Sequence, residues 1–233
     1  MITLVGVGHV FAISAQVRDV VRSRRPEVVC IELDPARYHA LMNPVAPRDI
    51  PLQYRVLAYF QKRMAGKFGT EVGDEMLAAV DAAKEVGAKL ALIDMDASRV
   101  FATLWKRMSV REKLHLMGGA LVGLVASKGF VEKELDKYEN ASDHYIELMG
   151  EGYPTVKEVL IDDRNKFMAD RISELASKHA SVLAVVGDGH VPGILANLGG
   201  AEAEVVRLKD LRKEPAQAVS GSEFSASFWI RDQ

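Results

Sequence analysis

Two copies of one short histidine motif stand near opposite ends of the chain. Residues 5–10 and 186–191 are identical at five of six positions, and the shared Gly-x-Gly-His ends in His9 or His190. A neutral imidazole is a common metal ligand and carries protons near neutral pH. Each copy follows an apolar, β-branched run and precedes a helix-like pattern, which predicts a strand, a turn and a helix. A tight turn around a packed histidine is the alternative for each copy.

A carboxylate, Glu32, stands at the end of a second apolar run, residues 28–33, which we predict to be a buried central strand. A buried carboxylate is costly unless it is paired or binds a metal. Two histidines and a glutamate are a ligand set of catalytic zinc sites that keep the fourth position for water. A salt bridge from Glu32 to Arg37 or Arg164 is the alternative, and the two arrangements can coexist.

A charged run, Asp-Asp-Arg-Asn at 162–165, falls within a predicted long helix. These residues either form a solvent-exposed face of the helix, or Arg164 points into the crevice. There its planar guanidinium could bind a carboxylate of the substrate. Asp94 follows the third predicted strand and has a weaker claim to the site than Glu32. Asp34 is predicted to cap a helix, and Asp188 to stabilise its own turn. The remaining histidines are interpreted as surface or packing residues: His39, His115, His144 and His179.

The elements that position these side chains follow from hydrophobic periodicity and from turn residues. Strands are predicted at 2–5, 28–33, 89–93, 182–186 and 204–208. Because the carboxyl ends of parallel strands lie along one edge of a sheet, the two histidines should face the same crevice at that edge. Helices are predicted from Ser14 to the arginines before Pro26 and at 35–41, 51–67, 74–86, 97–108, 110–127, 131–149, 155–178 and 190–198, with a serine-to-glutamate capping box at Ser109.

Composition bounds the function. The net charge of −2 gives no basic surface for nucleic acid, and a single cysteine, Cys30, excludes an internal disulfide. Phe11 and Pro192 stand where the dinucleotide fingerprint needs a third glycine, so NAD binding is not expected. No apolar run reaches the ~18 residues of a membrane-spanning helix. We expect a cytoplasmic protein, with membrane association as the alternative.

We predict one α/β domain over residues 1–213, with a helical lobe at about 97–152 and a loose tail at 214–233. The apolar, glycine-rich stretch 114–126 is interpreted as packed inside that lobe. Its alternatives are a homodimer seam and a membrane contact. The central sheet is expected to be mostly parallel, since strands alternate with helices.

Four motifs together resemble the TraB/PrgY family of pheromone-shutdown proteins. They are residues 4–10, residues 30–38 around Glu32, residues 163–169 around Arg164, and residues 185–194. The stretch 87–94 is similar to the middle of that family. Two features depart from it. Many microbial members carry membrane segments after the soluble domain, which we do not expect here, and Met95 stands where an arginine often follows the aspartate.

The resemblance implies a wider kinship with Tiki proteases, ChaN-like haem-binding proteins and erythromycin esterases. It implies an α/β core of two related β-turn-α-β halves, whose site pairs the two histidine motifs with a glutamate and an arginine. Mapped by motif, the site is His9, Glu32, Arg164 and His190, with Arg37 as a further candidate.

The preferred hypothesis is a metal-dependent hydrolase that acts on a peptide or protein substrate. His9, His190 and Glu32 would hold a divalent ion such as zinc, manganese or cobalt, with Glu32 as ligand or general base. Arg164 would bind substrate or stabilise an oxyanion. The alternatives are a binding protein that sequesters a peptide without cutting it, and a haem-binding protein.

Overall fold

The computed structural model describes residues 1–8, 13–43, 73–114 and 152–213. Within these residues five parallel strands form one sheet in the order β3-β2-β4-β1-β5. This confirms the predicted α/β class and its parallel sheet. The strands are β1 (Ile2–Val7), β2 (Val28–Ile31), β3 (Lys89–Leu92), β4 (Val182–Gly187) and β5 (Ala203–Val206).

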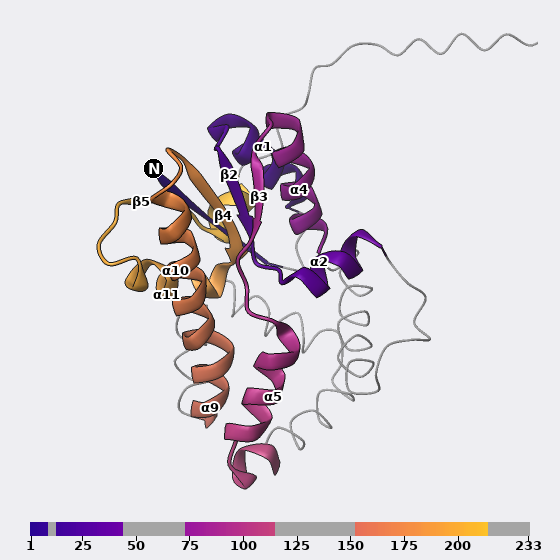
Figure 1. Ribbon diagram of the computed structural model, residues 1–233, viewed down its shortest axis with the longest axis vertical. Helices are drawn as coiled ribbons and strands as arrows, with labels where there is room; N and C mark the ends of the chain where they lie inside the picture. Colours follow the sequence, from indigo (N-terminus) through magenta and orange to yellow (C-terminus); the bar gives the residue numbers. More distant parts are fainter. Residues whose placement is uncertain (9–12, 44–72, 115–151, 214–233) are drawn as a thin grey trace, which may run out of the picture.

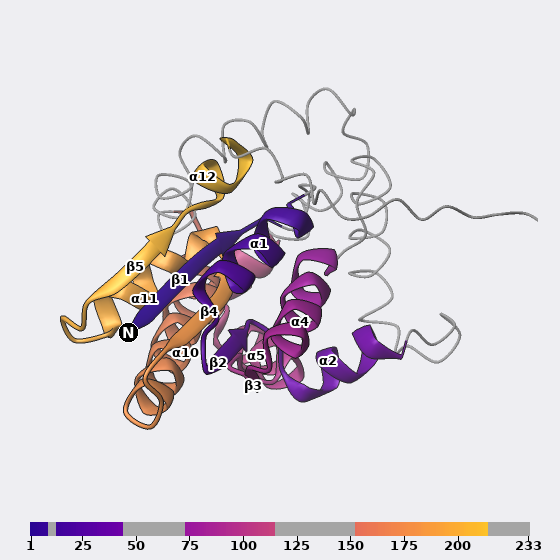
Figure 2. The ribbon, with the colours of Figure 1, turned by 90° about the horizontal axis from the view of Figure 1, so that it is seen from above.

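Helices cover both faces of the sheet (Figures 1 and 2). One apolar core lies beneath α1 (Ser14–Arg24), α4 (Asp74–Val86) and α12 (Leu208–Lys213), and a second lies beneath α10 (Asp163–Ala176) and α11 (Val191–Asn197). The central strands β1 and β2 are buried throughout, whereas the edge strands β3 and β5 are partly exposed. The near-continuous apolar runs read from the sequence therefore belong to strands buried on both faces.

The two histidine motifs begin two similar halves, β1-α1-β2 and β4-α11-β5. The halves exchange their second strands: β2, from the first half, lies next to β4 of the second half, and β5, from the second half, lies next to β1 of the first. The helices of the two halves, α1 and α11, pack on opposite faces of the sheet. The halves are therefore related by an approximate two-fold axis that runs along the strands between β1 and β4.

The strand register explains how the repeat fits this symmetry. The sequence repeat aligns Val5 with Val186, but the sheet pairs Val5 with Val185. A one-residue offset turns equivalent side chains to opposite faces. Val5 accordingly packs in the core beneath α1, and Val186 in the core beneath α10 and α11.

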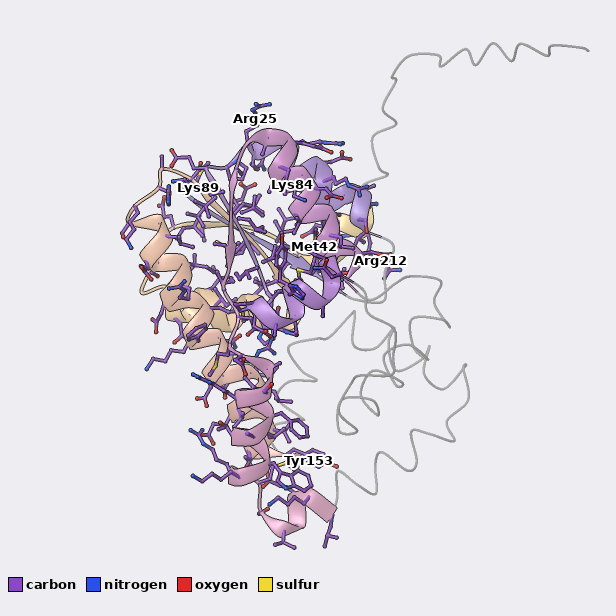
Figure 3. The ribbon with its side chains drawn as sticks, turned by 45° about the vertical axis from the view of Figure 1, so that its right-hand side comes forward. Arg25, Met42, Lys84, Lys89, Tyr153 and Arg212 are labelled. Atoms are coloured by element: carbon purple, nitrogen blue, oxygen red, sulfur yellow. The ribbon has the colours of Figure 1, made fainter. Side chains whose placement is uncertain are left out.

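A second group of helices extends past the carboxyl edge of the sheet (Figure 1). Here α5 (Ala97–Arg107) packs against α9 (Pro154–Lys157) and the turn that follows it. Figure 3 shows Tyr153, just before α9, at the opposite end of the molecule from Arg25. The predicted capping box joins this group: the Ser109 hydroxyl accepts from the Glu112 N–H, and the Glu112 carboxylate accepts from the Ser109 N–H at 2.9 Å.

The predicted carboxyl ends of the strands differ from the observed ends by one or two residues, and two of the strands were predicted two residues too long. Strand β2 ends at Ile31 rather than Leu33, because the Leu33 N–H turns back to the Ile31 carbonyl at 2.8 Å. Strand β5 ends at Val206 rather than Leu208, because the Leu208 N–H donates to Asp188 instead of a neighbouring strand.

The helix predictions have mixed outcomes. Asp34 caps α2 (Pro35–Met42) as predicted, accepting from two N–H groups, whereas Ser14 is the first residue of α1 and makes no capping bond. The predicted helices at 51–67 and 131–149 and the tail from 214 lie outside the described residues, as do residues 115–151 of the predicted lobe. None of the described helices combines the length and the apolar character needed to cross a bilayer.

Candidate functional site

The candidate site lies at the carboxyl edge of the central strands. Glu32 comes directly after β2, and Asp94 comes after β3 with one residue between them. His190 is the last residue of the 3₁₀ turn that follows β4. Because β2 and β4 are neighbouring parallel strands, the side chains that follow them lie close together, although these residues are far apart in the sequence. Arg164 reaches them from α10, which covers one face of the sheet. The structure thus brings together three of the predicted residues: Glu32, Arg164 and His190.

Glu32 is held by partners on both carboxylate oxygens and is only 7% exposed. The N–H of Gly187 donates to its Oε2 at 2.6 Å, and the Arg164 Nη2 donates to its Oε1. Burial alone would raise the pKa of this carboxyl group. Its interactions with the protonated form of His190, with Arg164 and with the Gly187 N–H outweigh burial and hold the pKa well below the ordinary glutamate value. Glu32 is therefore a fixed negative charge.

Hydrogen bonding assigns the tautomer of neutral His190. Its Nδ1 lies 2.7 Å from the amide oxygen of Asn165, and its Nε2 lies 3.1 Å from the Arg164 Nη1. An amide oxygen can only accept and a guanidinium can only donate, so the proton is inferred on Nδ1. The Nε2 lone pair then faces Glu32 Oε1 at 3.3 Å, with the guanidinium contacting both atoms.

A π-turn delivers Arg164 to this position. The helix that begins at α9 changes to π-helical geometry over Glu158–Asp162 before α10 continues it, and the Asp163 N–H bonds to the Glu158 carbonyl five residues back. The Leu160 carbonyl accepts from the Arg164 side chain at 3.0 Å. Such turns inside α-helices occur frequently at functional sites. The charged run at 162–165 is thus divided: its two aspartates pair with Lys157 and Arg107 on the exposed side, while its arginine and asparagine face inward.

Asp94 has a larger part than the sequence suggested. Its side chain is 1% exposed and accepts from the Arg164 Nε at 3.0 Å and Nη2 at 2.8 Å. It also pairs with the Nη2 of Arg37. The position of Asp94 after a strand, parallel to that of Glu32, was the signal in the sequence that could have found it.

Arg37 lies at the outer end of the network. Its Nε donates to Asp34 at 2.7 Å, and it reaches Glu32 only at the backbone carbonyl, at 3.5 Å. The structure therefore joins Arg164, and not Arg37, to the Glu32 carboxylate. With its side chain 39% exposed, Arg37 is the network's contact with solvent.

Asn165 is a site residue that the sequence analysis did not single out. It is buried, and its amide oxygen fixes the ring of His190. Gly193, at the start of α11, leaves room for it, since a Cβ there would lie 2.7 Å from the Asn165 Cγ. Only the hydrogen-bonding capacity of asparagine beside Arg164 could have indicated this role.

Gly193→Ala should therefore destabilise the protein by about 1–3 kcal/mol, the usual cost of overpacking, and disturb His190. Urea denaturation checks the first effect, and imidazole ¹⁵N shifts of His190 check the second. The control is Gly152→Ala, because nothing lies within 4 Å of a Cβ at that position. Equal stability of the two variants, with unchanged His190 shifts, would contradict the role given to Gly193.

Asp188 ties its turn to the residues that follow β5, and the hydrogen bonds of its carboxylate to Arg207 and Leu208 lie outside the turn that it was predicted to stabilise. It accepts from the Nε and Nη2 of Arg207, both at 2.9 Å, and from the Leu208 N–H at 2.9 Å. Its carboxylate fills the space beside Gly6, where a Cβ would overlap it. The two motif copies are therefore fitted to one another across β1 and β4 by a glycine and an aspartate.

Several predicted residues lie elsewhere. His9 lies outside the described residues, as do His115 and His144. His39 is on α2, and His179 lies 3.2 Å from Glu27 on the exposed surface. Across the described parts of the chain, no group of three metal-ligating side chains gathers at one point. His190 Nε2 and Glu32 Oε1 still have the separation of two ligands on one tetrahedral zinc ion, which is about 3.3 Å for bonds near 2.0 Å. These two residues fit part of such a site.

Comparison with known proteins agrees with the motifs. The model of the TraB/PrgY/gumN family matches residues 1–199. The uncharacterised protein MJ1365 of Methanocaldococcus jannaschii is 30% identical over 230 residues, which cover 91% of this chain and 58% of that protein. The chain thus spans little more than half the length of this relative.

Proposed function

This chain belongs to the TraB/PrgY/gumN family, and on that premise we propose that it is a metal-dependent hydrolase acting on peptides. The observation that carries the proposal is the pair of potential ligand atoms at the sheet edge, His190 Nε2 and Glu32 Oε1, which lie 3.3 Å apart. The proposal includes the wider kinship with Tiki proteases suggested by the motifs. It does not extend to the part of the longer archaeal relative that this chain does not cover.

The described residues support a metal in two respects. The Nδ1 of His190 is hydrogen-bonded to Asn165, and metal-ligating histidines almost always make such a bond at their second nitrogen. The linked network also holds three carboxylates (Glu32, Asp34 and Asp94) against two guanidiniums (Arg37 and Arg164), so that a further positive charge is favoured. In this proposal His9 supplies the third ligand.

The low pKa of Glu32 distinguishes between its two candidate roles. A general base works best with a pKa near the working pH, and Glu32 is a much weaker base than that. Glu32 therefore acts as a ligand rather than as a general base. When bound, a divalent metal ion supplies Lewis-acid chemistry, polarising a carbonyl and activating water.

Arg164 supplies the second positive group. It contacts Glu32 and His190 through its two terminal nitrogens, and Asp94 holds it through Nε at 3.0 Å. Because Asp94 holds the guanidinium at this edge of the sheet, Arg164 can donate to a substrate oxygen that gains negative charge.

The test is to incubate the purified chain with a mixed peptide library and to detect new termini by mass spectrometry. Cleavage should appear with added manganese, cobalt or zinc and should disappear with a chelator and in Glu32→Gln. Saturable binding with intact peptides would instead support a sequestering protein. Turnover that survives metal removal and Glu32→Gln would overturn the proposal, and a Soret band on titration with haemin would support the haem alternative.

A further inference from the structure

The outward side of α5 and the residues after it form a surface that the candidate site does not use. Val100, Leu104 and Met108 form the inner side of this segment and pack against Val156 and Val159. Phe101 and Trp105 lie outside that contact and are 44% and 47% exposed. Being four residues apart, they form one row along the helix.

Basic residues flank the aromatic row. Between residues 97 and 114 there are five basic residues and a single acidic one, in a chain whose net charge is −2. The acidic residue, Glu112, already accepts from Ser109 and Thr155. Among the described residues no carboxylate pairs with the basic side chains that form a second row or continue it: Arg99, Lys106 and Arg111.

Apolar side chains continue the surface beyond α5. Val110 and Leu114 are highly exposed, and the Lys113 ammonium lies 5.2 Å from the centre of the Trp105 ring. The sequence from 114 to 127 carries no Lys, Arg, Asp or Glu. A nucleic acid would interact favourably with the basic residues but not with the aliphatic ones. The boundary between lipid headgroups and acyl chains interacts favourably with both, and tryptophan is enriched there.

We propose that this surface, made by Arg99, Phe101, Trp105, Lys106, Arg111 and Leu114, docks onto an anionic lipid bilayer. The aromatic row enters the interface, and the basic row contacts the headgroups through its long side chains. Charge complementarity selects the partner, since each basic residue near an anionic membrane contributes about 1 kcal/mol, or about fivefold in binding.

The experiment uses the full chain and vesicles of phosphatidylcholine with and without phosphatidylglycerol. In a Trp229→Phe background, Trp105 is the only tryptophan. Its emission should shift to the blue with anionic vesicles, and co-sedimentation should fall steeply in about 1 M salt, where the Debye length is about 3 Å. Replacing Arg99, Lys106 and Arg111 with glutamine should weaken binding by about 100-fold.

A second variant tests the aromatic row separately. Phe101→Ser with Trp105→Ser should abolish sedimentation with anionic vesicles. Phe167→Ser, at an aromatic residue of similar exposure on α10, should leave it unchanged. Circular dichroism would check that each variant is folded. The proposal is overturned if wild type binds neither kind of vesicle, or if it binds neutral vesicles as well as anionic ones. Binding of DNA or an acidic polypeptide in place of lipid would also overturn it. So would wild-type binding by both the glutamine variant and the Phe101→Ser, Trp105→Ser variant.

Discussion

Arg164→Met should lower the free energy of unfolding by about 3–5 kcal/mol at neutral pH, the usual cost of removing one partner from a buried ion pair. The side chain is only 15% exposed and contacts two buried carboxylates, Glu32 and Asp94. Asp94 keeps Arg37, but Glu32 keeps only the Gly187 N–H and His190. This loss is a large share of the 5–15 kcal/mol by which a typical domain is stable.

The pH dependence gives the prediction its sign. In wild type the lowered pKa of Glu32 contributes stability that is present above the ordinary glutamate pKa of about 4.3 and is lost as the pH falls through the folded value. In Arg164→Met the burial of Glu32 is less compensated, and burial raises a carboxyl pKa. The pKa of Glu32 should therefore be higher in the variant than in wild type, and the variant should gain less stability than wild type as the pH rises from acidic values through the ordinary glutamate value. The difference between the two proteins should shrink toward pH ~4, near the ordinary glutamate pKa.

Urea denaturation from acidic to neutral pH measures this difference. Arg107→Met is the matched control, because Arg107 pairs with Glu158 and Asp163 but is largely exposed. Exposed ion pairs contribute at most about 1 kcal/mol. An Arg164→Met variant no less stable than Arg107→Met would refute the view that a buried charge network holds the site.

His190→Ala should reduce peptide turnover by more than about 100-fold, which exceeds the 10–100-fold loss typical when only a partner that orients a ligand is removed, and should lower metal content. The residue presents its Nε2 to Glu32, and among the described residues it is the only imidazole that contacts Glu32. Turnover and elemental analysis of the same preparation provide the two readouts. His179→Ala is the control, since His179 lies on the surface beside Glu27.

Asn165→Ala separates positioning from chemistry. It removes the acceptor of the Nδ1–H while leaving the imidazole in place, and loss of such a partner typically costs 10–100-fold in metal affinity or activity. An intermediate loss, with weaker metal binding, is expected. Full activity in both His190→Ala and Asn165→Ala would exclude His190 from the reaction.

Much of the architecture follows from local patterns. Apolar, β-branched runs such as 182–186 can be stable only as strands covered on both faces, so they predict a parallel sheet with helices on each side. Asp34 before Pro35 predicts a capped helix because a side-chain oxygen can satisfy the free N–H groups of a first turn. These features depend on neighbours in sequence, and the structure has them as predicted.

The site divides differently. Local patterns alone placed His190 and Glu32 at strand ends, because glycines interrupt a β-branched run and a carboxylate is rarely buried within one. The sequence left open whether Arg164 faces solvent or the site, and it gave Asp94 little weight and Asn165 none. Those outcomes rest on the order β2-β4-β1 and on the π-turn before Arg164, which bring side chains about 70 to 130 residues apart into contact. Local periodicity carries no information about such contacts, because the free energy that fixes them comes from burying opposite charges together, which only the packed chain can do.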